Sequence, residues 1–412
     1  MRLLIVNFAG DLREDLQRLS AGGNETYYAQ RYSIAAYAGL RQYADEVASL
    51  VYLTPTAYDE LLPNGVRAIG CGFKGFDDLD PNAIIQTIEA YNPTHLVLLV
   101  MDKHVLSWAV EKKIPTVTTF ANTIPIQSAS PLHRLVRSLK NQKIVKLLNQ
   151  PNIEWVGSYG INSSRRLQQL GVKAEKIVPW DFLIDANPGG FSPKSLDPQK
   201  QTWNLCFIGT ICEDKGVGDL LKAVQRLKAR SVTVRLTLVG SDSANFAKPM
   251  IAKLGLGDAV DLPGFVPNHE VEPLMHRADL VIVPSRHKYP EGFPLVIHHA
   301  LRACTPIVAS NHPMFQGYLQ HQANAMIFPE GNVAALADCI ETVLTDAALY
   351  QQISAVSHHT WHQLGLPVKW ADLVNRWASQ TAADRQWLAA QSLKNSGQQL
   401  LPVPLSLRMS NA

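Results

Sequence analysis

The residues best suited to chemistry lie in two short segments, residues 209–217 and 284–301. The first follows an apolar, strand-like run and contains Lys215 close to the start of a helix-patterned segment. The second contains Glu291 and Gly292 directly before another helix-patterned run. Glycine lets the backbone approach a ligand closely, and a lysine near the start of a helix supplies positive charge for a phosphate. Taken alone, the first segment is equally typical of an ordinary turn between a strand and a helix.

The segment around Glu291 concentrates the groups expected of an anion site. Gly292 permits a tight turn, and the first-turn N–H groups of Leu295 and Val296 have no acceptor within their own helix, so they can point at an anion. Pro294 has no N–H to donate, but proline suits a first helical turn. Two roles stay open for Glu291, which either caps the helix or accepts hydrogen bonds from ligand hydroxyl groups.

Short apolar runs rich in β-formers alternate with helix-patterned segments along most of the chain. The runs are residues 3–8, 46–53, 95–101, 116–120 and 154–158 in the first half, and 205–209, 235–239, 259–262, 279–283 and 306–309 in the second. This alternation predicts βαβ units and parallel sheets.

The length of 412 residues, 46% of them hydrophobic, favours two domains because one ordinary core does not grow to that size. We predict two Rossmann-like, doubly wound α/β domains that face a central cleft, where ligands of open α/β sheets bind. The predicted parts are a first domain over 1–187, a linker and hinge over 188–203, a second domain over 204–362, a helix over 363–381 returning to the first domain, and a flexible tail over 382–412.

An ordered set of short motifs spans about residues 20 to 380. The motifs are Gly22-Gly23, Gly209, Lys215-Gly216, Leu238-Val239-Gly240, Gly264-Phe265-Val266, Ala278-Asp279, Pro284-Ser285, Glu291-Gly292-Phe293, Thr305 to Ser310, and Phe328 to Gly331. Each motif is common, but in this order the set resembles the retaining glycosyltransferases of family 4. The resemblance implies the GT-B fold, a nucleotide diphosphate sugar as donor, and no metal.

The resemblance also implies roles for individual residues. Lys215 would pair with the diphosphate, and Glu291 with the hydroxyl groups of the donor sugar. The donor-binding set is Gly209, Thr210, Gly240, Gly264, Phe265, Gly292, Phe293, Leu295, Val296 and His299. The loop of Gly22, Gly23 and Asn24 is expected to contact the diphosphate or the acceptor, and the alternative is a plain N-cap turn before the following helix-patterned run.

Three positions depart from the family pattern. Thr210 stands where the family usually has an arginine, and His299 stands where a second glutamate binds the ribose. Ala121 occupies a position where many relatives carry a histidine, which leaves a polar group of the first domain unassigned. The candidates for that group are Asp102, His104 and Asn122.

The overall composition limits the kinds of partner and compartment that are expected. A formal net charge of +3 is far from the basic excess of a protein whose main partner is nucleic acid. The five scattered cysteines form no C-x-x-C pair, so they indicate neither a disulfide framework nor a zinc site and fit a reducing cytoplasm. The start of the chain reads as a strand rather than a secretion signal. No apolar run approaches the roughly 18 residues of a membrane span.

The stretch 131–150 carries five basic residues and no acidic one, with leucine and valine at helical spacing. It predicts an amphipathic basic helix. Two interpretations stay open, a packed helix with a solvated basic face and a peripheral contact with the anionic inner face of a membrane.

Together with these observations, the resemblance to family 4 implies a cytoplasmic retaining glycosyltransferase of polysaccharide biosynthesis. It would move a sugar from a nucleotide diphosphate donor, of the UDP or GDP type, to a glycan, glycolipid or small-molecule acceptor without a further cofactor. Two alternatives remain. Thr210, Ala121 and His299 motivate a non-catalytic protein that binds nucleotide-sugars or glycans on the same fold, and the other alternative is a sugar-nucleotide epimerase.

Overall fold

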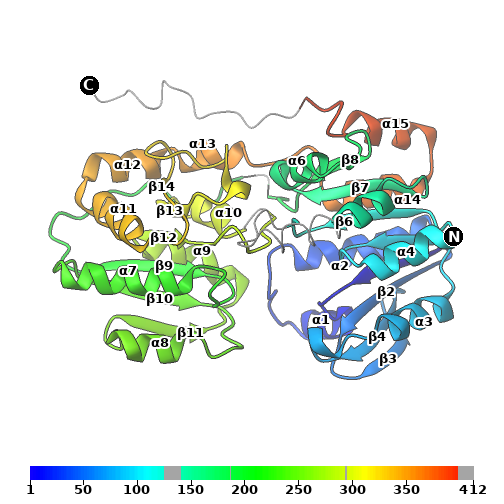
Figure 1. The fold of residues 1–412 in the computed structure, drawn as a ribbon, viewed down its shortest axis with the longest axis horizontal. Helices are drawn as coiled ribbons and strands as arrows, with labels where there is room; N and C mark the ends of the chain where they lie inside the picture. The colour runs from blue at the N-terminus through cyan, green and yellow to red at the C-terminus, as the bar shows by residue number, and fades with distance from the viewer. Residues whose placement is uncertain (125–140, 186, 293–294, 398–412) are drawn as a thin grey trace. The chain divides into compact units, whose positions relative to one another are not determined.

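The computed structural model describes residues 1–124, 141–185, 187–292 and 295–397. The chain divides into two compact units (Figure 1). Unit 1 contains the described residues of 1–184 together with 366–397, and unit 2 contains those of 185–365. The expected domain boundaries at 187 and 363 therefore lie close to the points where the chain passes from one unit to the other.

Among its described residues, unit 1 has an eight-stranded sheet. The strands are β1 (Arg2–Asn7), β2 (Glu46–Leu53), β3 (Ala57–Leu61), β4 (Arg67–Phe73), β5 (His95–Leu98), β6 (Thr116–Phe120), β7 (Ile153–Tyr159) and β8 (Ile177–Trp180). Their order is β3-β4-β2-β1-β5-β6-β7-β8. All neighbours pair in parallel except β3 and β4, which form an antiparallel edge hairpin.

Several of the α-helices described in unit 1 begin directly after a side-chain cap. The α-helices are α1 (Leu12–Ser20), α2 (Gln30–Gly39), α3 (Pro81–Tyr91), α4 (Lys103–Glu111), α6 (Ile161–Gln169), α14 (Trp370–Ser379) and α15 (Ala382–Ala390), and the 3₁₀ turns are η1 (Leu40–Gln42) and η2 (Phe76–Asp78). Asp11, Asp80 and Asp102 each precede a helix and accept hydrogen bonds from its first-turn N–H groups. Such caps satisfy donors that the helix itself leaves unpaired.

The chain returns to unit 1 through α14 and α15. The indole of Trp370 donates a hydrogen bond to Thr119 Oγ1 at 3.0 Å, which ties α14 to β6. After α15, the backbone N–H of Leu393 donates to the carbonyl of Ile177 at 2.7 Å, and Leu388 is fully buried. The expectation of a flexible tail from residue 382 is therefore wrong for residues 382–397, because this polar segment buries one apolar face. Residues 398–412 lie outside the described part of the chain.

The described part of unit 2 has a six-stranded sheet in which all neighbours are parallel. The strands are β9 (Trp203–Ile208), β10 (Val234–Val239), β11 (Val260–Gly264), β12 (Leu280–Val283), β13 (Ile307–Ser310) and β14 (Met326–Phe328). Their order is β11-β10-β9-β12-β13-β14. Numbered within the unit this is 3-2-1-4-5-6, the order of the Rossmann nucleotide-binding folds.

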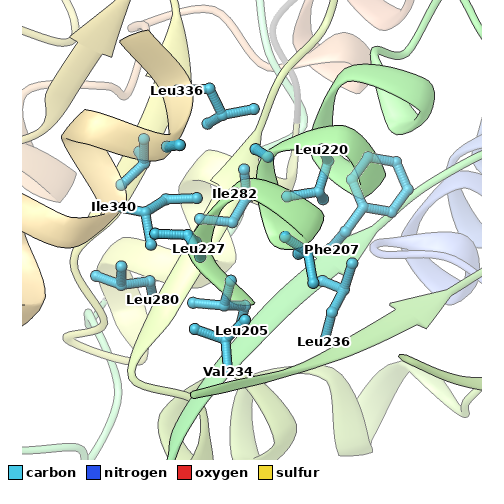
Figure 2. Packing of buried hydrophobic residues seen from close by; sticks show 14 of the residues in the cluster. Leu205, Phe207, Leu220, Leu227, Val234, Leu236, Leu280, Ile282, Leu336 and Ile340 are labelled. Atoms are coloured by element: carbon cyan, nitrogen blue, oxygen red, sulfur yellow. The ribbon is translucent and has the colours of Figure 1, made fainter. Parts of the chain in front are cut away.

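The helices of unit 2 alternate with its strands. They are α7 (Val217–Ala229), α8 (Ala247–Leu254), α9 (Asn268–Arg277), α10 (Leu295–Arg302), α11 (Val333–Thr345), α12 (Ala347–Ala355) and α13 (Ser357–His362), with one 3₁₀ turn, η3 (Pro313–Phe315). Figure 2 shows alternate strand residues such as Leu205 and Ile282 directed at apolar side chains of α7 and α11, among them Leu220 and Ile340. Cys206, the next residue along β9, is also buried, so both faces of the sheet are covered.

The segment predicted as a linker, residues 188–203, lacks regular secondary structure up to the start of β9. It nevertheless packs on unit 2. Leu196 contacts the core of that unit, and the backbone N–H of Lys194 donates to Ser354 Oγ at 2.7 Å. The Lys194 ammonium also donates to the carbonyl of Ala278. The hinge expected at Gly189 and Gly190 stays a prediction.

Candidate functional site at the carboxyl edge of the second sheet

Four of the sequence motifs of unit 2 lie at the carboxyl ends of strands. Gly209 follows β9, Gly240 follows β10, Gly264 ends β11, and Pro284 with Ser285 follows β12. Because parallel strands end at one edge of the sheet, these residues meet there. The strand order reverses between β9 and β12, and open α/β sheets bind ligands outside the carboxyl ends at such a point.

Two glycines allow the loops at this edge to approach one another. A Cβ atom on Gly216 would lie 2.0 Å from the carbonyl oxygen of Pro284, and one on Gly240 would lie 2.0 Å from the carbonyl oxygen of Gly209. Both glycines have positive φ, 73° and 134°. The loops after β9, β10 and β12 can therefore pack at backbone contact only with glycine at these two positions.

Lys215 and Glu291 meet at this edge. Lys215 Nζ lies 2.5 Å from Glu291 Oε1, and the Ser285 hydroxyl donates to the same oxygen at 2.7 Å. The two charged side chains are only 12% and 6% exposed. Lys215 Nζ also lies 4.3 Å from the ring centroid of Tyr289. The structure thus brings together the two residues predicted to act on the donor, although they are 76 residues apart in the sequence.

Ion pairs fix the loop that carries Glu291. The guanidinium of Arg286 forms two hydrogen bonds with Asp219, at 2.8 and 2.7 Å, and also pairs with Glu213 at 2.7 Å. The hydrogen bonds to Asp219 raise the pKa of Arg286. Lys288 forms a further pair with Asp214. The loop is therefore held by both the lysine-bearing segment and the start of α7.

Two histidines connect the loop that carries Glu291 to the segments after β13 and β14. His287 Nδ1 lies 3.0 Å from Glu330 Oε1. His312 is 1% exposed, and its Nε2 lies 3.2 Å from the carbonyl of Tyr289 while its Nδ1 accepts from the N–H of Met314 at 3.2 Å. Burial lowers the pKa of His312 to about 4. Its ring is therefore neutral at pH 7, with Nε2–H as the donor to Tyr289.

Helix α10 is described from Leu295 onward, and the N–H groups of Leu295 and Val296 stay predicted as first-turn donors. Gly292 is half-buried just before it, whereas Phe293 lies outside the described residues. His299 is 6% exposed, and its Nδ1 lies 2.9 Å from Glu272 Oε1 of α9. A carboxylate from another helix thus stands beside the histidine that replaces the expected second glutamate.

Glu272 joins His299 to the segment that leads into unit 2. Arg302 Nε lies 2.6 Å from Glu272 Oε1, and Arg302 Nη1 lies 2.9 Å from Asp185. Burial would raise the pKa of Glu272, but the hydrogen bond with His299 and the charges of His299 and Arg302 outweigh it and lower the pKa.

The remaining donor-side candidates differ in exposure. Phe265, after β11, is 77% exposed, and Thr210 is also exposed. Burial raises the pKa of Tyr289, and the opposing influences include Lys215 and a hydrogen bond from the Thr210 side chain. Thr210 therefore lies beside the buried pair, at the position where the family usually has an arginine.

The glycine loop of unit 1 has a structural role. Gly22 has φ 81°, and the N–H of Gly23 donates to the carbonyl of Arg18 at 2.9 Å, which closes the C-terminus of α1. A Cβ on Gly23 would lie 2.6 Å from Arg18 Cγ. Arg18 Nε donates to the carbonyl of Asn24 at 3.1 Å. The loop thus closes the end of α1, and the expected N-cap turn is wrong because α2 begins after Ala29 without a side-chain cap. The ligand contact stays a prediction.

The three polar candidates of unit 1 lie near two neighbouring strand ends. Asp102 caps α4 after β5, with Oδ1 accepting from the N–H of His104 at 2.7 Å and Oδ2 accepting from the hydroxyl of Tyr52 at 3.1 Å. The side chains of His104 and Asn122 are exposed, and Asn122 follows β6. Asp102 is thus the one of the three with hydrogen bonds described here that fix its side chain.

Comparison with known proteins identifies the nature of unit 2. Residues 191–358 match the model of the family described as "Glycosyl transferases group 1". The amylovoran biosynthesis glycosyltransferase AmsK of Erwinia amylovora is 30% identical over 176 residues, which are 42% of this chain and 43% of that protein. The putative colanic acid biosynthesis glycosyltransferase WcaL of Escherichia coli is 27% identical over the same shares. Residues 191–358 are therefore similar to the group 1 glycosyltransferases.

Solved structures resemble this chain over both units. Sucrose-phosphate synthase from Thermosynechococcus elongatus has a TM-score of 0.65 at 17% identity, covering 95% of this chain and 100% of that one. Anabaena HepE in complex with UDP-glucose has a TM-score of 0.61 at 20% identity, covering 93% and 99%. The chain has the GT-B fold of these proteins, with a parallel-sheet α/β unit on each side of the boundary. The sequence matches to the curated relatives span less than half of their length.

The sequence did not predict several residues that hold the loops at the carboxyl edge of the unit 2 sheet. Asp219, Glu272, Glu330 and His312 are separated from their partners by 67, 27, 43 and 23 residues, and no short motif connects them. Glu330 was noted within a family motif, but its contact with His287 was not anticipated. Only alignment with relatives or a fold could have revealed these pairs.

The sequence analysis also led to expectations about metal sites and membrane contacts. Within the described residues no group of three or more His, Cys, Asp or Glu side chains is placed to hold a metal ion. No helix among them is long and apolar enough to span a bilayer. Residues 141–148 of the predicted basic stretch are helical, while 131–140 lie outside the described residues.

A cavity of about 520 Å³ in unit 2 is lined by Thr202, Thr233 and Ala259. It lies at the amino ends of the strands, away from the motif residues at their carboxyl ends.

Proposed function

We propose that the protein is a glycosyltransferase that moves a sugar from a nucleotide diphosphate to a glycan, glycolipid or small-molecule acceptor with retention at the anomeric carbon. The observation that carries this proposal is the buried contact between Lys215 and Glu291 beside the start of α10. The group 1 match and the biosynthetic glycosyltransferases among the relatives support it. They also favour a role in polysaccharide biosynthesis.

The diphosphate is the natural ligand of this edge. An anion near the start of α10 would receive the first-turn N–H groups of Leu295 and Val296 and the positive end of the helix dipole. Lys215 would turn from Glu291 to the diphosphate. Glu291, released from its ammonium partner, could then accept hydrogen bonds from the hydroxyl groups of the donor sugar. The contacts of Lys215 and Glu291 with the donor would replace the contact that these two side chains make with each other.

The proposed reaction proceeds on one face of the sugar. The bond between the anomeric carbon and the diphosphate oxygen breaks, the acceptor oxygen forms a new bond to that carbon, and the departing diphosphate accepts the acceptor's proton. Lys215 and the α10 amides stabilise the charge that develops on the leaving group. One such preorganised donor contributes about 3 kcal/mol to transition-state stabilisation in other enzymes.

The structures of relatives indicate which donor to test first. One of the similar structures is a complex of HepE with UDP-glucose. We therefore propose a UDP-sugar as donor, with GDP- and ADP-sugars as the comparison set. The proposed location is the cytoplasm, and the contact of residues 131–150 with an anionic membrane remains part of this proposal.

The test is a two-step assay on the purified full chain. A thermal-shift screen with UDP-, GDP- and ADP-sugars first identifies the donor, because a ligand that binds the native state raises the melting temperature. Release of the nucleoside diphosphate with a panel of acceptors then measures turnover, and NMR of the anomeric proton tests retention. Lys222→Ala serves as the control for Lys215→Ala, since Lys222 is an exposed lysine on α7.

Each outcome of this assay separates the candidate functions. Transfer that is lost in Lys215→Ala and kept in Lys222→Ala supports the proposal. Binding without turnover over the whole acceptor panel favours the non-catalytic alternative. Conversion of the donor sugar to its epimer without an acceptor favours the epimerase. Absence of both binding and turnover with every nucleotide-sugar contradicts the proposal.

A further inference from the structure

A run of aromatic side chains crosses the carboxyl edge of the sheet in unit 1. Phe8 follows β1, Phe76 lies in η2 after β4, and Tyr52 belongs to β2. The rings of Phe8 and Phe76 stack with their centroids 4.4 Å apart and their planes at 26°. Tyr52 meets Phe8 edge-on, with centroids 6.3 Å apart, and its hydroxyl donates to Asp102 after β5. The run therefore spans the edge from β4 to β5.

This position is the ligand-binding edge of the unit. The strand order β4-β2-β1-β5-β6 reverses between β1 and β5, and ligands of open α/β sheets bind outside the carboxyl ends at that point. Phe8 and Asp102 follow the two strands that flank the reversal. The aromatic run therefore lies where the topology places a ligand, independently of any motif in unit 2.

Phe76 gives the run one open aromatic face, whereas the Tyr52 ring is only 1% exposed and packs edge-on against Phe8. Phe76 is 76% exposed although its ring stacks on that of Phe8, which is itself half-buried. Single exposed apolar residues are common on proteins. An exposed ring that is supported by a second ring at a ligand-binding edge is a more specific feature, because the stacked pair holds one aromatic face in a fixed orientation.

A buried carboxylate lies in the loop that carries Phe8. Asp11 is 8% exposed, and its Oδ1 accepts from the hydroxyl of Tyr58 at 2.5 Å and from the N–H of Arg13 at 2.9 Å. Its Oδ2 is buried, accepts no hydrogen bond from the described residues, and lies 3.8 Å from Arg13 Nη2. Buried polar atoms normally have a hydrogen-bonding partner, so this oxygen would gain one from a ligand hydroxyl that reaches it through a shift of the loop around Asp11.

We propose that the stacked rings of Phe76 and Phe8, supported by the buried ring of Tyr52, bind a hexopyranose ring of the acceptor. One face of a pyranose ring presents C–H groups that carry partial positive charge, and these match the negative face of an aromatic ring. The ring hydroxyls would donate to the carboxylates of Asp11 and Asp102. The inference rests on the proposed glycosyl transfer and specifies its acceptor as a sugar.

The charge and polarity of the surroundings favour a sugar over other occupants. A phosphorylated or carboxylated group would meet the carboxylates of Asp11 and Asp102, which repel it. An alkyl chain would cover the rings but would leave the Asp11 oxygen without a donor. A neutral polyhydroxylated ring satisfies both features at once, as small-molecule sites with apolar walls and a few placed polar groups usually do.

The test is saturation-transfer NMR with the full chain and defined probes. The probes are the methyl glycosides of glucose, galactose and mannose, with octan-1-ol as the alkyl comparison. Wild-type protein is expected to transfer saturation to the C–H protons of at least one glycoside. Phe76→Ala should reduce that signal at least fivefold, and Phe76→Trp should restore it. Leu61→Ala is the matched control, because Leu61 is an apolar residue of unit 1 that is 69% exposed on β3.

Three results would overturn the proposal: no saturation of any glycoside by wild-type protein, equal saturation by wild type and Phe76→Ala, or displacement of the bound glycoside by octan-1-ol at comparable concentration. Binding of UDP in the same samples tests the proposed donor site of unit 2 separately. Loss of glycoside binding with UDP binding intact contradicts only the acceptor site. Loss of nucleotide binding with glycoside binding intact contradicts only the proposed donor.

Kinetics give a second readout once an acceptor is known. Phe76→Ala is expected to raise the acceptor KM about tenfold, while donor hydrolysis without acceptor and the affinity for UDP stay at the wild-type values. A change in donor hydrolysis of the same size would show that Phe76 acts through the fold rather than on the acceptor.

Discussion

In both units the strand order reverses beside the first strand, between β9 and β12 in unit 2 and between β1 and β5 in unit 1. The edges formed at these points differ in chemistry. The edge of unit 2 carries a buried lysine–glutamate pair, glycines at backbone contact and a loop fixed by Arg286. The edge of unit 1 carries stacked rings and capping aspartates.

The difference shows that topology locates a ligand edge and side chains decide its ligand. Fixed charges and close backbone contacts suit a diphosphate, whose charge is constant among nucleotide-sugars. Aromatic faces with a few carboxylates suit neutral hydroxylated rings, which vary among acceptors. Four experiments would break or sharpen this comparison.

The largest expected effect is on turnover, from Lys215→Ala. Loss of one preorganised cation at the leaving group should reduce kcat by 10²- to 10³-fold, about 3 to 4 kcal/mol. Lys103→Ala, which removes an exposed lysine at the edge of unit 1, should change kcat less than twofold. Steady-state kinetics on both variants measures this difference, with circular dichroism as the check on folding. Equal losses of kcat in the two variants would contradict the assignment of the diphosphate to the edge of unit 2.

A double variant separates the effect of Lys215 on stability from its effect on turnover. Removing only Lys215 leaves Glu291 buried without its cation, and breaking a buried pair in this way commonly costs about 3 to 5 kcal/mol of stability. The double variant Lys215→Met/Glu291→Gln should therefore melt at a higher temperature than Lys215→Met while remaining inactive. A lower melting temperature for the double variant would mean that Glu291 is stabilised by other groups.

The second effect is on stability, from Gly216→Ala in unit 2 compared with Gly22→Ala in unit 1. Both glycines have positive φ, but an added Cβ meets the Pro284 carbonyl at 2.0 Å at Gly216 and nothing within 4 Å at Gly22. Backbone strain alone costs about 1 to 2 kcal/mol, and steric overlap adds about 1 to 3 kcal/mol. We expect a loss of about 3 kcal/mol for Gly216→Ala and about 1 kcal/mol for Gly22→Ala.

Urea denaturation followed by tryptophan fluorescence measures both losses. The wild-type chain provides the reference curve for each transition. If the two variants lose the same free energy of unfolding, the loops at the unit 2 edge can move apart, and the close packing of Gly216 against Pro284 is not needed for stability.

The third effect is a pH dependence that originates at His312 in unit 2. Burial lowers its folded-state pKa to about 4, whereas the unfolded-state value is about 6.5. Between these values the unfolded chain binds a proton that the folded chain does not, so the stabilising contribution is present above about pH 6.5 and is lost as the pH falls to 4. The full difference corresponds to at most about 3 kcal/mol.

Unfolding measured from pH 4 to pH 7 tests this contribution. His312→Asn keeps an acceptor for the Met314 N–H and should flatten the pH dependence. Burial also lowers the pKa of His95 in unit 1, but this side chain is only half-buried, so His95→Asn should flatten the curve less. A wild-type slope that His312→Asn leaves unchanged would place the titrating group elsewhere.

How much the sequence predicts also differs between the two edges. The apolar runs that predicted β2 and β6 match their bounds, because fully buried parallel strands read as continuous apolar segments. Lys215 and Glu291 were predicted because each lies in a short motif. The hairpin strand β3 was missed because its residues are mostly exposed and lack an apolar pattern.

The aromatic run of unit 1 could not be predicted from spacing. Phe8, Tyr52 and Phe76 come from three separate segments, and only the strand order brings them together. The same is true of His312 beside Tyr289. Residues 382–397 were mistaken for a tail because their polar composition hides the packing of Leu388. Contacts between distant segments depend on the tertiary fold, which local patterns do not encode.

The smallest expected effect compares two helix caps of unit 1, Asp102 and Asp80. Each accepts hydrogen bonds from the first turn of its helix, so replacement by alanine should cost about 1 kcal/mol in both cases. Asp102→Ala also removes the acceptor of the Tyr52 hydroxyl, which adds up to about 1 kcal/mol. If Asp102 binds the acceptor sugar, its variant should in addition raise the acceptor KM, whereas Asp80→Ala should leave it unchanged. Thermal unfolding and acceptor kinetics on the same two variants measure both effects, and an equal KM in the two would confine Asp102 to its capping role and make the unit 1 edge purely aromatic.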